Sequence, residues 1–197
     1  MKSICVFCGS SLGARPAYQE AAKQLGQILA ERGLQLVYGG GNVGLMGIVA
    51  DATLAAGGEA IGVIPEFLAV KEIAHMNLTQ LHVVPSMHDR KAMMADLADG
   101  FIALPGGFGT FEEFCEILTW AQLGLHPKPQ GLLNVEGYYD PLLQLFDQAV
   151  REKFLRADLR GLVLAATTPN SLLDQFQHYQ APNVEKWANL PIRPEVL

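Results

Sequence analysis

Short apolar segments alternate with amphipathic helical segments along almost the whole chain. The segments with a strand-like composition are 4–8, 34–38, 60–64, 81–84, 101–104, 131–134 and 162–165. The segments with helical periodicity are 16–32, 44–56, 86–98, 110–123, 139–153 and 171–179. Strands that are apolar throughout are buried on both faces, which is typical of a parallel sheet covered by helices. The pattern therefore predicts an α/β protein with a Rossmann-like, doubly wound, mostly parallel sheet and helices on both faces.

The length of the chain, 197 residues, suits a single α/β domain with a full core, although length alone also allows two small domains. The alternating pattern continues without an internal repeat, so we expect a single Rossmann-like domain over residues 1–180. From residue 181 the sequence contains Pro182, Pro191 and Pro194. Proline at this density predicts an extended C-terminal tail over residues 181–197.

The charge and the cysteine content exclude several classes of protein. A formal net charge of −6 argues against a nucleic-acid partner, whereas a mononucleotide needs only a local positive site. No apolar run reaches 18 residues, and the N-terminus lacks the features of a signal peptide, so we expect a cytoplasmic protein without a membrane partner. Three cysteines do not make a disulfide framework. Cys5 and Cys8 point to opposite faces of a strand, which predicts core residues, and the histidines show no ligand spacing, so we expect no metal.

Three glycine-rich loops follow predicted strands, at 8–13, 39–47 and 105–110. The carboxyl ends of parallel strands meet at one edge of the sheet, where ligands of such folds bind. The third loop opens a helix, whose first N–H groups have no partner within the helix and lie at the positive end of its dipole. Loop and helix together predict a phosphate site. No loop contains the P-loop motif, and the first loop reads Gly9-x-x-x-Gly13 rather than the dinucleotide-binding pattern G-x-G-x-x-G.

Two charged side chains next to this predicted site could carry chemistry. Arg90 falls on the apolar face of the helix 86–98, where a guanidinium needs an anionic or hydrogen-bonded partner. That partner could be a ligand or an internal acid, and neighbouring Lys91 could likewise meet a phosphate or a surface acid. Glu113 lies at the border of the apolar face of the next helix, which suits a catalytic carboxylate. Alternatively, Thr110 and Glu113 form a literal capping box, in which Glu113 would accept from the Thr110 N–H.

The residues 105–113 match the P-G-G-x-G-T-x-x-E signature of the Lonely Guy (LOG) family, the cytokinin riboside 5′-monophosphate phosphoribohydrolases. The chain resembles this family along nearly its whole length. Further matching segments are 6–11, 38–47, 87–91, 119–124 and 131–139.

The resemblance implies a Rossmann-like homodimer or higher homo-oligomer. It also implies hydrolysis of the N-glycosidic bond of an adenine-type nucleoside 5′-monophosphate, to free base and ribose 5-phosphate, without a cofactor. The catalytic pair of the family falls on Arg90 and Glu113. The expected substrate-binding positions are Glu72, Lys91, Gly107, Phe108, Gly109, Thr110 and Thr119, with Ser10, Gly40, Gly41 and Met46 from the first two loops. The surroundings of Glu72 depart from the plant R-E-x-T-G-E pattern, which leaves the base preference open.

Two other functions are compatible with parts of the sequence. Related Rossmann-like proteins carry nucleotides or molybdopterin-type cofactors without turnover, but a carrier would not need Arg90 and Glu113 together. The family has also been labelled lysine decarboxylase. Pyridoxal-phosphate chemistry needs a Schiff-base lysine with a supporting acid and a phosphate cup. Only Lys91 lies in a motif here, beside an arginine, so this label is disfavoured.

Overall fold

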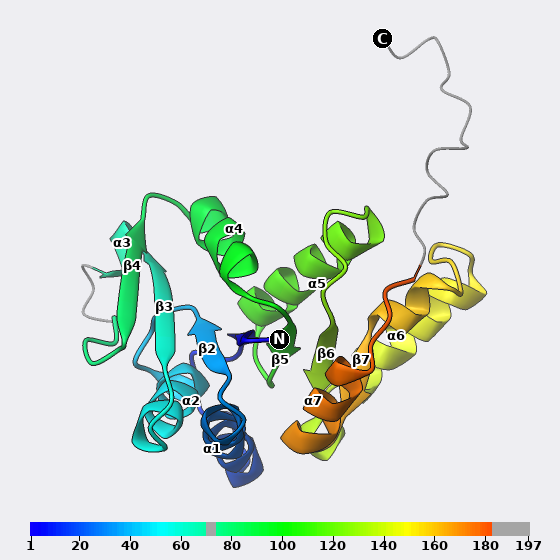
Figure 1. The fold of residues 1–197 in the computed structure, drawn as a ribbon. Helices are drawn as coiled ribbons and strands as arrows, with labels where there is room; N and C mark the ends of the chain where they lie inside the picture. The colour runs from blue at the N-terminus through cyan, green and yellow to red at the C-terminus, as the bar shows by residue number, and fades with distance from the viewer. Residues whose placement is uncertain (70–73, 183–197) are drawn as a thin grey trace, which may run out of the picture.

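The computed structural model describes residues 1–69 and 74–182 (Figure 1). Glu72, and the predicted tail from residue 183 onward, lie outside the described residues.

A parallel sheet of seven strands forms the centre of the protein (Figure 1). Its strands are β1 (Ser3–Phe7), β2 (Gln35–Tyr38), β3 (Ala60–Pro65), β4 (Gln80–Val84), β5 (Phe101–Ala103), β6 (Gln130–Leu133) and β7 (Leu164–Ala166). Their spatial order is β4-β3-β2-β1-β5-β6-β7, and every neighbouring pair is parallel. The predicted doubly wound architecture is confirmed.

Helices cover both faces of the sheet because alternate strand residues point to opposite sides. One face packs against α1 (Pro16–Glu31), α2 (Gly44–Ala55) and α7 (Pro169–Gln177). The other face packs against α4 (Met87–Leu97), α5 (Phe108–Gln122) and α6 (Asp140–Arg151). The short helices α3 (Glu66–Leu68), η2 (Val135–Gly137) and η3 (Leu159–Leu162) complete the described elements.

The two cysteines near the N-terminus illustrate this division of the core. Both are buried and free, and they lie in the clusters on opposite faces of the sheet, as the strand pattern predicts. Each fully buried leucine of the core, such as Leu25 or Leu36, contributes about 2 kcal/mol to folding.

The strand order creates a switch point between β1 and β5. From β1 the chain builds outward through β2 and β3 to β4, and then returns to β5 on the other side of β1. The loops after β1 and β5 therefore lead to helices on opposite faces, which leaves a crevice at the carboxyl ends of the strands. Backbone hydrogen bonds join the three glycine loops there: Gly9 N–H donates to Pro105 O (3.1 Å), and Leu45 N–H donates to Gly9 O (3.0 Å).

Most observed element boundaries lie one or two residues from the predicted ones, and the shifts at β7 and α5 have clear structural consequences. β7 begins at Leu164 rather than at residue 162, because residues 159–162 form the 3₁₀ helix η3. α5 begins at Phe108, two residues before the predicted start, and this shift changes the surroundings of Glu113. Within the described part of the chain, no helix is both long and apolar enough to cross a bilayer.

Candidate active site

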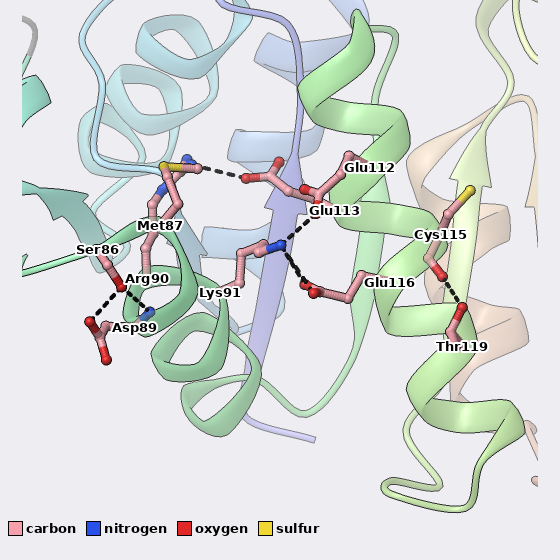
Figure 2. A network of polar contacts seen from close by, with 10 residues as sticks. All are labelled: Ser86, Met87, Asp89, Arg90, Lys91, Glu112, Glu113, Cys115, Glu116 and Thr119. Atoms are coloured by element: carbon pink, nitrogen blue, oxygen red, sulfur yellow. Dashed lines mark hydrogen bonds and ion pairs between the residues drawn. The ribbon is translucent and has the colours of Figure 1, made fainter.

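Arg90 is a buried side chain of α4 that is bonded on several sides. Ser86 caps the helix as predicted, since its Oγ accepts from Asp89 N–H at 3.2 Å. The Arg90 Nε donates to the carbonyl oxygen of Val63 at 3.1 Å. Its Nη1 lies 3.0 Å from Glu113 Oε1, an ion pair between α4 and α5 (Figure 2). The expected partner for a guanidinium on the apolar face is therefore an internal acid.

Glu113 does not cap its own helix, so the capping-box alternative is wrong. α5 begins at Phe108 with Gly107 as its N-cap, which places Thr110 inside the first turn rather than at the cap. The carboxylate instead points across to α4, where it meets Arg90. Glu113 is only 7% exposed. Burial raises the pKa of the Glu113 carboxyl above its ordinary value, and the charge of Arg90 offsets only part of that increase.

Lys91 faces the polar side of α5 and not the Glu113 carboxylate. Its Nζ lies 2.5 Å from Glu112 Oε1 and 3.0 Å from Glu116 (Figure 2). Burial would lower the pKa of Lys91, but the hydrogen bonds to the two acids raise it above its ordinary value. Of the two partners that the sequence allowed for Lys91, the structure shows the acids, and these contacts join α4 to α5.

A cavity of about 280 Å³ opens in front of the Arg90–Glu113 pair. Nine of the predicted site residues line it: Ser10, Gly41, Met46, Arg90, Gly107, Phe108, Gly109, Thr110 and Glu113. They come from all three glycine loops and from the helices α2, α4 and α5. Phe108 stands at the start of α5 with 92% of its surface exposed. The structure thus brings together the charged pair and the first residues of α5, as the sequence predicts.

Three other predicted residues do not line this cavity. Lys91 is tied to α5, as described above. Gly40 has a positive φ of 72° and packs near Ile64 and Leu81. The Thr119 Oγ1 donates to Cys115 O at 2.8 Å (Figure 2), and Thr119 lines a separate apolar hollow of about 230 Å³ between α5, α6 and η3.

Five residues that the sequence analysis did not assign to the site also line the cavity: Cys8, Gly9, Gly39, Ile64 and Leu68. Gly39 is required by contact, since a Cβ on it would lie 1.8 Å from Arg90 Nη2. The glycine run 39–41 is visible in the sequence as a candidate ligand loop, but the sequence gives no sign that Arg90 lies against Gly39. Burial, followed by the charge of Glu113, raises the pKa of the Cys8 thiol, which therefore stays uncharged.

Two walls of the cavity differ in their electrostatic character. On one side, the N–H groups of Gly107, Phe108, Gly109 and Thr110 begin α5 and have no partner within it. These groups and the helix dipole favour an anion. On the other side, a buried carboxylate is held by a guanidinium. The arrangement can bind a phosphate and place an acid beside the group attached to it. Among residues 1–69 and 74–182, no cluster of three His, Cys, Asp or Glu side chains could hold a metal.

The chain is similar to several known proteins. A family model described as "Possible lysine decarboxylase" matches residues 46–176. The probable cytokinin riboside 5′-monophosphate phosphoribohydrolase LOGL1 of Oryza sativa subsp. japonica is 52% identical, over 92% of this chain and 82% of the relative. The cytokinin riboside 5′-monophosphate phosphoribohydrolase LOG7 of Arabidopsis thaliana is also 52% identical, over 91% of this chain and 82% of the relative.

Among solved structures, the molybdenum cofactor binding protein from Rippkaea orientalis has a TM-score of 0.68 and 25% identity. That match covers 90% of this chain and 97% of the other. The Moco carrier protein from Chlamydomonas reinhardtii has a TM-score of 0.67 at 20% identity, with 90% and 96% covered, and shows the fold alone.

Proposed function

Because the chain belongs to the LOG family of cytokinin riboside 5′-monophosphate phosphoribohydrolases, we propose that it hydrolyses the N-glycosidic bond of adenine-type nucleoside 5′-monophosphates. The products are the free base and ribose 5-phosphate, and the substrate is AMP, N6-prenylated AMP or both. One observation carries the proposal: the Arg90–Glu113 ion pair faces the same cavity as the unpaired N–H groups of α5.

In this proposal, the start of α5 binds the 5′-phosphate. The N–H groups from Gly107 to Thr110 point out of the helix end, and the lack of side chains at Gly107 and Gly109 lets an anion approach the backbone. A phosphate fixed there holds the ribose against the opposite wall of the cavity. The sugar and the catalytic groups are then already in the reactive geometry, which lowers the entropic part of the barrier. No metal is needed for this contact.

Glu113 then acts at the anomeric carbon. As the bond from C1′ to the base nitrogen breaks, positive charge develops on the ribose, and a nearby carboxylate stabilises it. The same carboxylate accepts a proton from the attacking water as the oxygen of that water bonds to C1′. The base leaves with the bonding electron pair and takes up a proton, which balances the reaction.

Arg90 has two functions available to it. Its contact with Glu113 counters the effect of burial and so favours the ionised, reactive form of the carboxyl. The Val63 carbonyl fixes the guanidinium in that orientation. A fixed positive charge at this place also stabilises negative charge on the departing base or on the phosphate.

The proposal extends to the assembly of the protein and to Thr119. The protein acts as a cytoplasmic homodimer or larger homo-oligomer on a small nucleotide, not on nucleic acid or a membrane. Thr119 lies away from the cavity of its own chain, on a hollow at the other side of α5. A contact of Thr119 with nucleotide therefore requires the cavity of a second copy.

Product analysis with three substrates tests the proposed reaction. Purified protein is incubated with AMP, N6-prenylated AMP and adenosine, and free base and ribose 5-phosphate are measured. We expect base release from at least one of the two nucleotides and poor cleavage of adenosine, which lacks the phosphate. Equal cleavage of adenosine and AMP would contradict the phosphate anchor. Tight binding of either nucleotide without any base release would instead favour a carrier, the function named for the protein from R. orientalis.

A further inference from the structure

Three successive carbonyl groups in front of α5 each accept a hydrogen bond from one of two distant segments of the chain. Leu104 O accepts from the hydroxyl of Tyr139 (2.6 Å), and Pro105 O accepts from the N–H of Gly9 (3.1 Å). Gly106 O accepts from the hydroxyl of Tyr138 (2.5 Å). The backbone that leads into the proposed phosphate site is therefore fixed at every peptide group from 104 to 106.

The Tyr138 bond has a direct consequence for the neighbouring N–H group. A trans peptide is planar, so its C=O and its N–H point in opposite directions. The carbonyl of Gly106 points towards Tyr138, and the N–H of Gly107 in the same peptide therefore points away from it. Gly107 is the N-cap of α5, and its N–H is the first of the four that the helix leaves unpaired. Tyr138 thus sets the direction of one proposed phosphate donor.

The ring of Tyr138 is itself held rigidly. It packs edge-on against Tyr139 (centroids 5.0 Å apart) and against Tyr18 (5.7 Å). The preceding turn contains Glu136 in the left-handed region, with φ of 48°, a conformation that costs a non-glycine residue free energy. The Glu136 carboxylate pairs with Arg15 of the loop after β1 (2.9 Å), which links that loop to the same turn.

We propose that Tyr138 is a positioning residue for the phosphate of the substrate, because its hydroxyl holds the 106–107 peptide with the N–H turned towards the anion. This inference rests on the proposed function, since it assumes that phosphate binds at the start of α5. Tyr138 lines a hollow of about 320 Å³ that adjoins the cavity of Arg90 and Glu113, with Gly9, Ser10 and Gly107 lining both, but Tyr138 does not line that cavity itself. It therefore acts through the backbone and not by contact with the reacting atoms.

The substitution Tyr138→Phe tests the role of the hydroxyl because it keeps the ring and its packing. Loss of one hydrogen bond of ordinary strength is expected to raise the KM for AMP and the inhibition constant of inorganic phosphate, each about fivefold. The kcat should change less than twofold, since Arg90 and Glu113 are untouched. The matched control is Tyr18→Phe, which removes a hydroxyl from the adjoining ring and leaves the bond to Gly106 in place; both constants should stay at their wild-type values.

The outcomes separate this inference from the proposed function. If inorganic phosphate does not inhibit the wild-type protein, the phosphate site is wrong, and the role of Tyr138 with it. If phosphate inhibits the wild type and Tyr138→Phe equally, or if only kcat falls in the variant, the inference about Tyr138 is overturned and the site stands. The increase in Tm produced by phosphate gives the same comparison without an activity assay, so a less stable variant still yields an answer.

Discussion

Gly39→Ala is a one-carbon change that should inactivate the protein without unfolding it. Gly39 lies after β2, directly beneath the guanidinium of Arg90. A Cβ at this position would lie 1.8 Å from Arg90 Nη2 and 3.0 Å from its Cζ, whereas ordinary contacts begin near 3.4 Å. The terminal nitrogen must therefore withdraw by about 1.6 Å, and this movement is larger than the Arg90–Glu113 contact of 3.0 Å can accommodate without breaking or reorienting.

The expected cost to catalysis follows from this displacement. A misplacement of about 1 Å at a catalytic group lowers the rate by on the order of 100-fold, equivalent to about 2.7 kcal/mol in the barrier. The fold should survive, because the clash falls on the end of a flexible side chain and Gly39 is not among the glycines with positive φ. We expect the kcat for adenine release from AMP to fall about 100-fold, with a change in Tm of only a few degrees.

Gly161→Ala is the matched control for this prediction. A Cβ on Gly161, in η3, would meet nothing within 4 Å, so the same chemical change should leave both kcat and Tm close to the wild type. If Gly39→Ala keeps kcat within threefold of the wild type while the control behaves as expected, the position of Arg90 is not required. That result would refute the reasoning from the ion pair.

Three further predictions concern charge and metal. The acid limb of the pH profile of kcat/KM should have an apparent pKa above 4.5, because burial raises the pKa of Glu113 and the ionised carboxylate is the active form. An acid limb with an apparent pKa at or below 4.5 would assign the catalytic base to another group. Lys91→Met should lower Tm by several degrees, since Glu112 and Glu116 lose their buried partner. An unchanged Tm in calorimetry would show that this contact between α4 and α5 does not contribute to stability. EDTA should leave adenine release unchanged, and loss of activity that is restored by added metal would contradict the phosphate site built from N–H groups alone.

The sequence predicted the fold and the centre of the site because both depend on strong local patterns. Apolar strands and glycine loops indicated the parallel sheet and its ligand-binding edge. The position of Arg90 on an apolar helix face predicted an anionic or hydrogen-bonded partner, and the structure shows the acid Glu113 in that place.

Other features depend on contacts between distant segments, which a local pattern does not contain. The T-x-x-E match allowed a cap at Thr110 as an alternative, but the helix begins two residues earlier, and helix ends are the least certain part of any such prediction. The close approach of Arg90 to Gly39 and the bond from Tyr138 to Gly106 each join segments that are far apart in the sequence. The same limit applies to Lys91, whose acidic partners lie on the next helix.

The most direct test of the account is a comparison of binding and turnover in Glu113→Gln. The amide keeps the shape of the side chain and an oxygen for Arg90, but it can neither carry a negative charge nor accept a proton from water. Calorimetry should give a Kd for AMP within about threefold of the wild type, while adenine release falls on the order of 1,000-fold. Release that persists within tenfold of the wild-type rate, or AMP binding lost together with activity, would contradict the separation of phosphate anchor and catalytic acid on which the account depends.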